Sequence, residues 1–230
     1  MSKVLRLDET DDPGAVGQLG AQLAKLAKIG VRIVDGFVVP IGQKLEDGVS
    51  NEILMFFHKL KIQDAILRSS ANTLDYDSET IRGVKYDVLL GTIAYMQKNA
   101  ERRGQDAAII VQRDLKAEVS GTVHTINPVT LNPREMLVEA NLWMNHTVLS
   151  GESEPDMIII NKRTGALSME SEEENEICLT PRQLVQLHAL ARKIEDRLDS
   201  DVSVDWAYDS GKLYVLRARP INQKTHERFK

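Results

Sequence analysis

The chain has 230 residues, of which 42% are hydrophobic and 27% charged, a composition typical of a globular protein with a sizeable core. The formal net charge of -5 argues against non-specific binding to a nucleic-acid backbone. The single cysteine, Cys178, excludes a disulfide within the chain, and no Cys/His spacing indicates zinc. We expect a cytoplasmic protein without membrane contact, because no apolar run approaches about 18 residues and the first residues lack a signal-peptide core.

The first half of the chain alternates between helical and extended patterns. Apolar residues spaced by three and four positions predict amphipathic helices, and short apolar runs bounded by turn residues predict strands. The expected elements are a helix over 14–29 closed by Gly30, a strand ending at Pro40, a helix over 50–60 capped by Ser50, a strand over 64–71 and a helix over 84–103.

The second half is predicted to consist of strands, one long helix and a closing hairpin. Residues 107–113 form a continuous apolar run, bounded by Gly104 and Asp114, that is typical of a buried strand. Thr180-Pro181-Arg182-Gln183 is a capping box with proline at the first helical position, so a helix begins there and runs to about Leu198. The acidic run 170–176 is interpreted as a solvated loop.

Residues 202–220 are predicted to form a β-hairpin around Asp209-Ser210-Gly211. We prefer a three-residue loop, because a two-residue loop would mix the apolar and charged faces. The preferred register pairs Tyr208 with Lys212, Val204 with Leu216 and Ser203 with Arg217.

This register leaves Asp205, Arg217 and Arg219 on one surface of the hairpin. One carboxylate beside two guanidinium groups can serve a metal-phosphate ligand such as MgATP. The alternative is an ordinary surface ion-pair cluster, since most such pairs are structural.

Several stretches, in collinear order over almost the whole chain, resemble the nucleotide-binding domain of phosphoenolpyruvate synthase and pyruvate phosphate dikinase. They are G-x-x-G-A-x-L-A-x-L and G-V-x-I-x-x-G-F-V-V-P within 17–40, R-S-S-A at 68–71, the strand 107–113 with E-V-S-G-T-V-H-T-I-N-P-V-T at 118–130, and V-D-W-A-Y-D-S-G-K-L-Y-V-L-R-A-R-P-I at 204–221. The resemblance implies an α+β, ATP-grasp-like fold of two lobes with mixed or antiparallel sheets. We expect an N-terminal lobe over 1–105, a C-terminal lobe over 106–221 and a flexible tail over 222–230.

The same resemblance implies site residues. Arg68 and Arg219 stand where arginines of the family contact phosphate, so a part in catalysis is expected for both. Asp205 stands where the family has an acidic magnesium ligand, and Glu139 is a second candidate ligand. Further nucleotide contacts are expected from Gly83, Lys85, Val111, Gln112, Arg113 and Arg217. The segment 111–114 would meet the base.

Some positions depart from the family pattern. Leu19 stands where the family has a phosphate-binding lysine, and Arg217 replaces a glutamine that binds the metal; arginine has no acceptor atom for a cation. Only Gly83 is kept in the loop over 81–86, and 143–146 replace a G-L-G-E stretch. His124 replaces an aromatic residue and is interpreted as a core or edge histidine rather than a ligand.

Two functions therefore remain open. The first is a phosphotransferase module that binds ATP and Mg²⁺ and passes a phosphoryl group to a histidine on a separate chain, as the resemblance implies. The second is a non-catalytic derivative that acts as a nucleotide sensor or as a scaffold for a protein partner. No nucleic-acid or membrane partner is expected, and the sequence predicts no oligomeric state.

Overall fold

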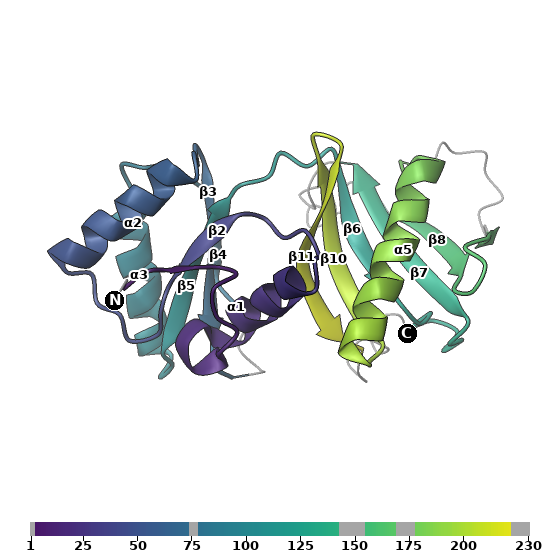
Figure 1. The fold of residues 1–230 in the computed structure, drawn as a ribbon, viewed down its shortest axis with the longest axis horizontal. Coiled ribbons are helices and arrows are strands. Elements are labelled where there is room, and N and C mark those ends of the chain that lie inside the picture. Colours follow the sequence, from purple (N-terminus) through teal and green to yellow (C-terminus); the bar gives the residue numbers. More distant parts are fainter. Residues whose placement is uncertain (1–2, 74–77, 143–154, 169–177, 222–230) are drawn as a thin grey trace. The chain divides into compact units, whose positions relative to one another are not determined.

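The computed structural model describes residues 3–73, 78–142, 155–168 and 178–221 (Figure 1). The chain divides into two compact units, Met1–Leu115 and Lys116–Lys230. Each unit contains one antiparallel sheet and its own helices, so the fold is α+β, as predicted. None of the helices in these described ranges has both the length and the apolar character needed to cross a bilayer.

The first unit is built on a five-stranded sheet with the order β1-β2-β5-β3-β4, antiparallel throughout. Its elements are β1 (Leu5–Arg6), α1 (Pro13–Lys28), β2 (Gly36–Val39), α2 (Asp47–Lys59), β3 (Ala65–Ala71), β4 (Thr80–Val84), α3 (Leu89–Arg102) and β5 (Ala107–Arg113). Strand β5, which the sequence analysis placed in the second lobe, lies in this sheet between β2 and β3.

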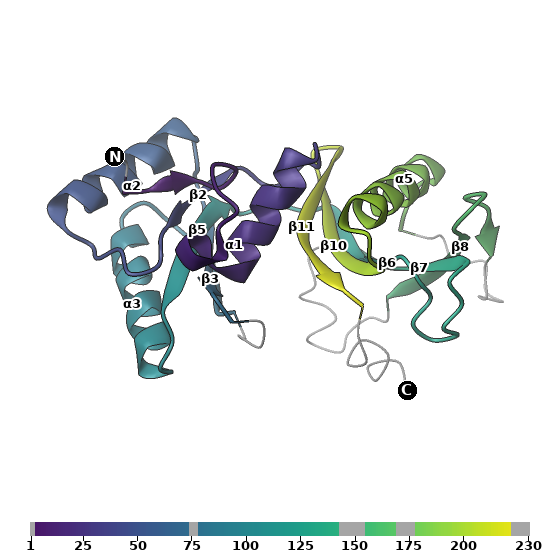
Figure 2. The same ribbon diagram turned by 60° about the horizontal axis from the view of Figure 1, so that its bottom comes forward.

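Helices cover both faces of the first sheet (Figure 2). On one face, alternate apolar residues of β2, β3 and β5 pack against α2 and α3 in a single core that includes Phe37, Leu67, Ile109, Ile53 and Ile93. Helix α1 packs against β3 and β5 on the other face. Because side chains alternate along a strand, residues such as Arg68 that flank core positions face the α1 side.

Helix α1 is broken near its start. Asp12 caps it by accepting a hydrogen bond from Gly14 N (2.9 Å), and Pro13 occupies the first turn. Gly17 then leaves the helical conformation at φ 70°, where a Cβ atom would lie 2.0 Å from the carbonyl oxygen of Ser70. Glycine at this position therefore allows α1 to dock directly on β3.

The second unit is built on a six-stranded antiparallel sheet with the order β11-β10-β6-β7-β8-β9. Its elements are β6 (Val119–His124), β7 (Glu135–Leu142), β8 (Asp156–Asn161), β9 (Leu167–Ser168), α5 (Pro181–Leu198), β10 (Val202–Asp209) and β11 (Lys212–Pro220). The predicted capping box at the start of α5 is confirmed, since Thr180 and Gln183 exchange both hydrogen bonds.

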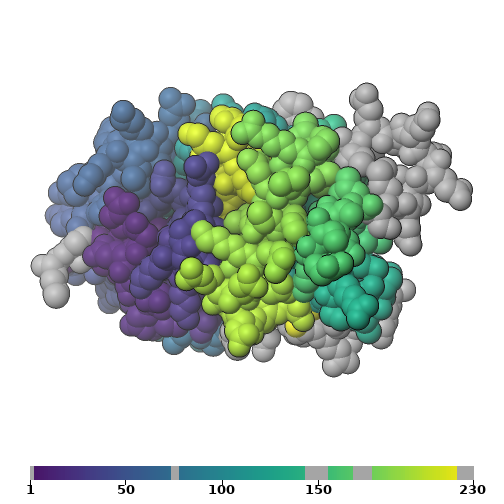
Figure 3. Space-filling model, turned by 45° about the vertical axis from the view of Figure 1, so that its right-hand side comes forward, coloured from purple at the N-terminus to yellow at the C-terminus, as the bar shows by residue number. Residues whose placement is uncertain are grey.

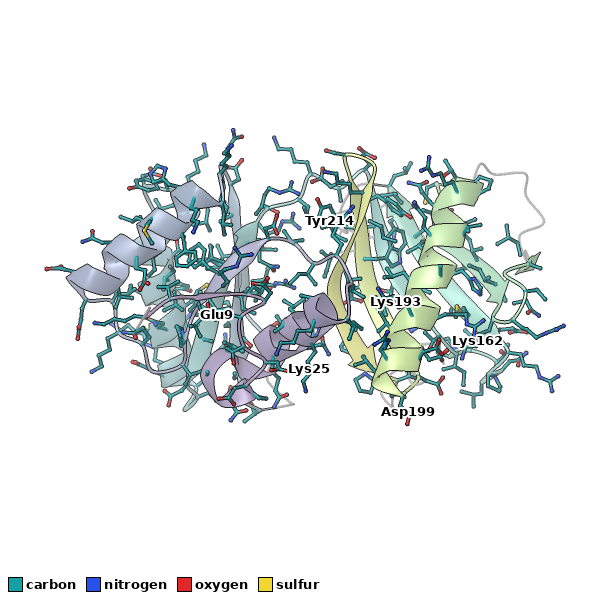
Figure 4. The ribbon with its side chains drawn as sticks, viewed as in Figure 1. Glu9, Lys25, Lys162, Lys193, Asp199 and Tyr214 are labelled. Carbon is teal, nitrogen blue, oxygen red and sulfur yellow. The ribbon has the colours of Figure 1, made fainter. Side chains whose placement is uncertain are left out.

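Helix α5 covers one face of the second sheet (Figure 2) and leaves its own outer face exposed (Figure 3). Its buried residues are Leu184, Leu187, Ala191 and Ile194. Tyr208 on β10 donates to the carbonyl oxygen of Gln183 at 3.1 Å. Lys162 directly follows β8 and is labelled in Figure 4. Its Nζ lies 2.6 Å from Glu195 Oε1 of α5, a second ion-pair or hydrogen-bond contact between this helix and the sheet.

The hairpin register predicted from the sequence is wrong. Asp209 pairs with Lys212, so the loop has two residues, Ser210 and Gly211, both with positive φ. Such a loop matches the natural twist of a hairpin. The mixing of faces that argued against it is avoided by a β-bulge, because Trp206 pairs with Val215 while Asp205 pairs with Arg217.

Two smaller expectations are also corrected. Helix α2 begins at Asp47, so Ser50 lies inside the helix and does not cap it. The segment expected as a loop over 81–86 is largely the edge strand β4. Other expectations fall on 143–146, 148–154, 170–176 and 222–230, which lie outside the described residues.

Candidate functional site

Arg68 is held on the α1-facing side of the first sheet by a neighbouring glutamine. Its Nη2 donates to Oε1 of Gln112 on β5, and Nε2 of Gln112 donates to the carbonyl oxygen of Val34 at 2.7 Å. Gln112 is only 1% exposed. A buried amide that uses both of its ends in this way fixes the direction of the arginine side chain.

Gly36 provides the space that Gln112 needs. It is the β2 partner of Gln112 in the ladder. A Cβ atom at Gly36 would lie 2.6 Å from Gln112 Cγ and 2.4 Å from the carbonyl oxygen of Val111. The glycine of the G-F-V-V-P stretch thus supports Arg68 indirectly, through the glutamine.

The two serines that follow Arg68 have structural partners. Ser70 Oγ donates to the carbonyl oxygen of Val16 at 2.8 Å and accepts from Gly20 N at 3.1 Å, so it ties β3 to both parts of the broken helix α1. Ser69 Oγ accepts from Glu79 N at 2.8 Å, which fixes the chain entering β4. Both serines of R-S-S-A thus have structural roles, and the contact of Arg68 with phosphate stays a prediction.

Other predicted contacts of the first unit have different surroundings. Val111 lies in the core on the α2 and α3 side, so its side chain faces away from Arg68. Gly83 N donates to Asp114 Oδ2 at 3.1 Å on the edge strand β4, and Lys85 is exposed just beyond it. Arg113, at the end of β5, is partly buried. Their roles toward a nucleotide stay predictions.

Arg82, which could have supplied positive charge here, is engaged within the same unit. It forms an ion pair with Asp114 and donates to the carbonyl oxygen of Leu115 at 3.2 Å.

In the second unit, Asp205 is the centre of a charged cluster on the face opposite α5. Arg219 Nη2 donates to both of its carboxylate oxygens, at 3.1 and 3.0 Å, and Thr122 Oγ1 donates to Oδ1 at 3.1 Å. Arg217 is the ladder partner of Asp205. The sequence analysis thus placed Asp205, Arg217 and Arg219 on one surface, and the β-bulge produces that arrangement by a different register.

A buried polar group lies beside this cluster. His124 Nδ1 lies 2.8 Å from Ser203 Oγ, and His124 Nε2 lies 2.8 Å from Glu139 Oε1. His124 is 2% exposed, as expected for a core histidine. The sequence analysis missed its pairing with Glu139, although alternation along two adjacent strands places both residues on one face.

The described residues do not fit a resident Mg²⁺ ion. Magnesium prefers an octahedral shell in which one or two carboxylates join waters and phosphate oxygens. Asp205 already receives Arg219 and Thr122, and Glu139 is held by His124. In the part of the chain that the structure describes, no group of three or more His, Cys, Asp or Glu residues could hold a metal.

Comparison with known protein families identifies the family to which the chain belongs. Residues 88–168 and 163–230 match the sequence model of the pyruvate phosphate dikinase, AMP/ATP-binding domain. The chain belongs to this family. The match contains Asp205, Arg217 and Arg219 of the second unit, whereas Arg68 lies before it.

Curated relatives agree with this assignment. An uncharacterized phosphotransferase, YvkC of Bacillus subtilis, is 23% identical over 291 residues, which include 96% of this chain and 35% of the relative. A phosphoenolpyruvate synthase of Pyrococcus furiosus is 28% identical over 51% of this chain and 18% of its own length. A rifampicin phosphotransferase of Streptomyces is 26% identical over 54% and 17%. The chain thus spans about a third or less of these relatives.

Solved structures identify the fold. A biotin carboxylase complex with β-γ-ATP from Campylobacter jejuni has a TM-score of 0.55 at 12% identity, covering 91% of this chain and 42% of that one. The ADP complex of an N5-carboxyaminoimidazole ribonucleotide synthetase has a TM-score of 0.54 at 14% identity, covering 89% and 45%. The ATP-grasp-like fold expected from the sequence is therefore confirmed.

Proposed function

We propose that this chain binds ATP through Arg68, Arg217 and Arg219 and forms the nucleotide-binding part of a phosphotransferase. The observation that carries the proposal is the cluster of Arg219, Asp205 and Thr122, with Arg217 opposite Asp205, within the stretch that matches the AMP/ATP-binding domain family. Guanidinium groups bind phosphate oxygens with directed, charge-assisted hydrogen bonds. The curated names of the relatives, phosphoenolpyruvate synthase and phosphotransferase, point to the same chemistry.

In this proposal, Arg68 and Arg219 are the groups with which the chain itself would hold the nucleotide phosphates during phosphoryl transfer. Such transfer depends on holding the nucleotide in line with an acceptor and on neutralising charge on the phosphoryl oxygens. Asp205 orients Arg219, and Gln112 orients Arg68, so two guanidinium groups are fixed before the ligand arrives. Prior positioning lowers the entropy that a flexible arginine loses when it binds phosphate.

We propose that the acceptor histidine belongs to another domain or chain. His124 has a hydrogen-bonding neighbour at each ring nitrogen and is buried, and His188 Nε2 lies 2.8 Å from the carbonyl oxygen of Lys162. His124 therefore offers no ring nitrogen to an open surface, and one nitrogen of His188 is engaged within the second unit. The relatives carry at least 65% of their length outside the matched region, since the match covers 35% or less. That length is ample for an acceptor domain.

Calorimetric titration and thermal unfolding with ATP, ADP and AMP test the binding. A ligand at 100 times its Kd adds about 2.7 kcal/mol to the stability of the folded state. Arg68→Ala and Arg219→Ala should each remove most of the ATP-induced shift. Arg163→Ala, in the exposed turn between β8 and β9, removes the same charge elsewhere and should leave the shift unchanged. Wild-type binding by both site variants contradicts the proposed site.

A non-catalytic nucleotide sensor is the second candidate, and two observations favour it. Leu19 stands where the resemblance places a phosphate-binding lysine, and it is buried in the first unit with 9% exposure. Arg217 stands where the resemblance places a metal ligand. The two candidates separate on turnover. A sensor binds ATP but forms neither ADP nor AMP in the presence of phosphohistidine domains from relatives, whereas a phosphotransferase transfers a phosphoryl group to the histidine and releases the remaining nucleotide.

A further inference from the structure

We infer that Thr122 is a positioning residue for the phosphate contact of Arg219. Thr122 itself touches no ligand in this arrangement. Its hydroxyl holds the carboxylate of Asp205, and that carboxylate directs the guanidinium of Arg219 toward a nucleotide phosphate. The inference rests on the proposed function and adds to it the residue that fixes one of the phosphate-binding groups.

Arg219 lies at a position where the backbone alone restrains a side chain weakly. It precedes the last residue of β11, and β11 is an edge strand of the six-stranded sheet. The side chain of Arg219 is 45% exposed. An edge strand is paired on one side only, and strand ends open more easily than strand centres. An unsupported arginine at this place would lose much rotamer freedom when it binds phosphate.

Thr122 lies at a better restrained position of the same sheet. It belongs to β6, which is paired with β10 on one side and with β7 on the other. Its ladder partner on β10 is Asp205. Threonine is branched at Cβ, which limits the rotamers available at χ1. The direction of the Thr122 hydroxyl is therefore set by a strand that is hydrogen-bonded along both edges.

The carboxylate of Asp205 connects Thr122 to Arg219. Arg219 Nη2 donates to both of its oxygens, at 3.1 and 3.0 Å, and Thr122 Oγ1 donates to Oδ1 at 3.1 Å. The bond from Thr122 restrains rotation of the carboxylate about Cβ–Cγ, a torsion that is otherwise broad. In the part of the chain that the structure describes, the side-chain hydrogen bonds of Arg219 all run through Nη2 to Asp205. Its Nε and Nη1 donors therefore remain for phosphate oxygens.

Calorimetric titration of the full chain with ATP tests the inference through two variants of one residue. Thr122→Val keeps the branched Cβ and the volume but loses the donor, so we expect the Kd to rise about tenfold. Thr122→Ser keeps the donor, and its Kd should stay within about threefold of the wild type. Thr92→Val, which removes a hydroxyl bonded to the carbonyl oxygen of Val88, is the matched control and should bind as the wild type. Wild-type binding by Thr122→Val, or equal losses in the valine and serine variants, overturns the inference and leaves the proposed function standing.

A double-mutant cycle shows whether Thr122 acts through Asp205. Asp205→Ala removes the connecting carboxylate, so adding Thr122→Val to it should change the Kd by less than about twofold. A tenfold loss in this background too means that Thr122 acts by another route, which overturns the inference. If Thr122→Val does not fold, Thr122→Ala compared with Thr122→Ser carries the same test. If the wild type does not bind ATP, the proposed function is refuted and the inference falls with it.

Discussion

Gln112→Met provides a direct test of the support beneath Arg68. Methionine fills similar space but removes the acceptor of Arg68 Nη2 and the donor to the carbonyl oxygen of Val34. A hydrogen bond to a charged group contributes about 1.5–3 kcal/mol and a neutral one about 0.5–1.5 kcal/mol. Because the site is buried, water does not replace the lost partners. We expect a loss of about 2–4 kcal/mol in the stability of the first unit.

Hydrogen exchange followed by mass spectrometry measures this loss in peptides that cover β3 and β5. The expected loss corresponds to a decrease in protection of about 30-fold to 700-fold. Gln63→Met, in an exposed turn before β3, is the matched control and should leave protection unchanged. Both tryptophans belong to the second unit, so their fluorescence during urea unfolding should be the same in all variants. Equal protection in Gln112→Met and Gln63→Met refutes the support role of Gln112.

Three further changes are expected to have measurable effects. Gly17→Ala places a Cβ atom at a residue with positive φ and in collision with Ser70 of β3, so it should lower the thermal midpoint of unfolding. Gly42→Ala has a similar positive φ but open space around the Cβ atom and should lower the midpoint far less; equal shifts would contradict this account. Burial raises the pKa of Tyr208 to about 12, so above about pH 10 the unfolded chain releases a proton that the folded chain retains, and stability falls as pH rises. Tyr208→Phe should flatten that fall in urea titrations between pH 10 and 12, and a wild-type slope would be evidence against it. Burial, followed by a hydrogen bond with Asp156, raises the pKa of Cys178 to about 12, so alkylation should be slow at neutral pH and faster in Asp156→Asn; fast wild-type alkylation would exclude this account.

Elements with strong local signals were predicted well from the sequence. The capping box at Thr180 places the start of α5 at the correct residue, because both of its hydrogen bonds are local. Helix α2 has no side-chain hydrogen bond at its cap, so its start at Asp47 left no comparable signal, and Ser50 was chosen wrongly. The start of a helix can be predicted from the sequence where hydrogen bonds between neighbouring residues form its cap, as at Thr180.

The hairpin was predicted correctly in its outcome and wrongly in its geometry. Separation of apolar and charged faces is a sound constraint, and it placed Asp205 with Arg217 and Arg219. The requirement that apolar and charged side chains lie on opposite faces is met both by a three-residue loop and by a two-residue loop followed by a β-bulge. The two-residue loop at Ser210 and Gly211 with a later bulge was therefore not distinguishable from the preferred alternative.

The support of Arg68 was beyond sequence reasoning for a different reason. Gln112 is 44 residues from Arg68 and 78 residues from Val34 in the chain. No local pattern connects residues at such separations, and the strand order of the first sheet is needed to bring them together. The resemblance named Gln112 as a contact of the base, and that role stays a prediction.

The bulge on β11 makes one position of the strand different from its neighbours. Leu216 is the additional residue between the pair Trp206–Val215 and the pair Asp205–Arg217. Shortening the chain at Leu216 keeps every other residue on its own side of the sheet, whereas shortening it at Ala218 turns Arg219 toward the helix-covered layer. A deletion in this ribbon is therefore tolerable at Leu216, where it leaves both arginines pointing from the same face, and not at Ala218.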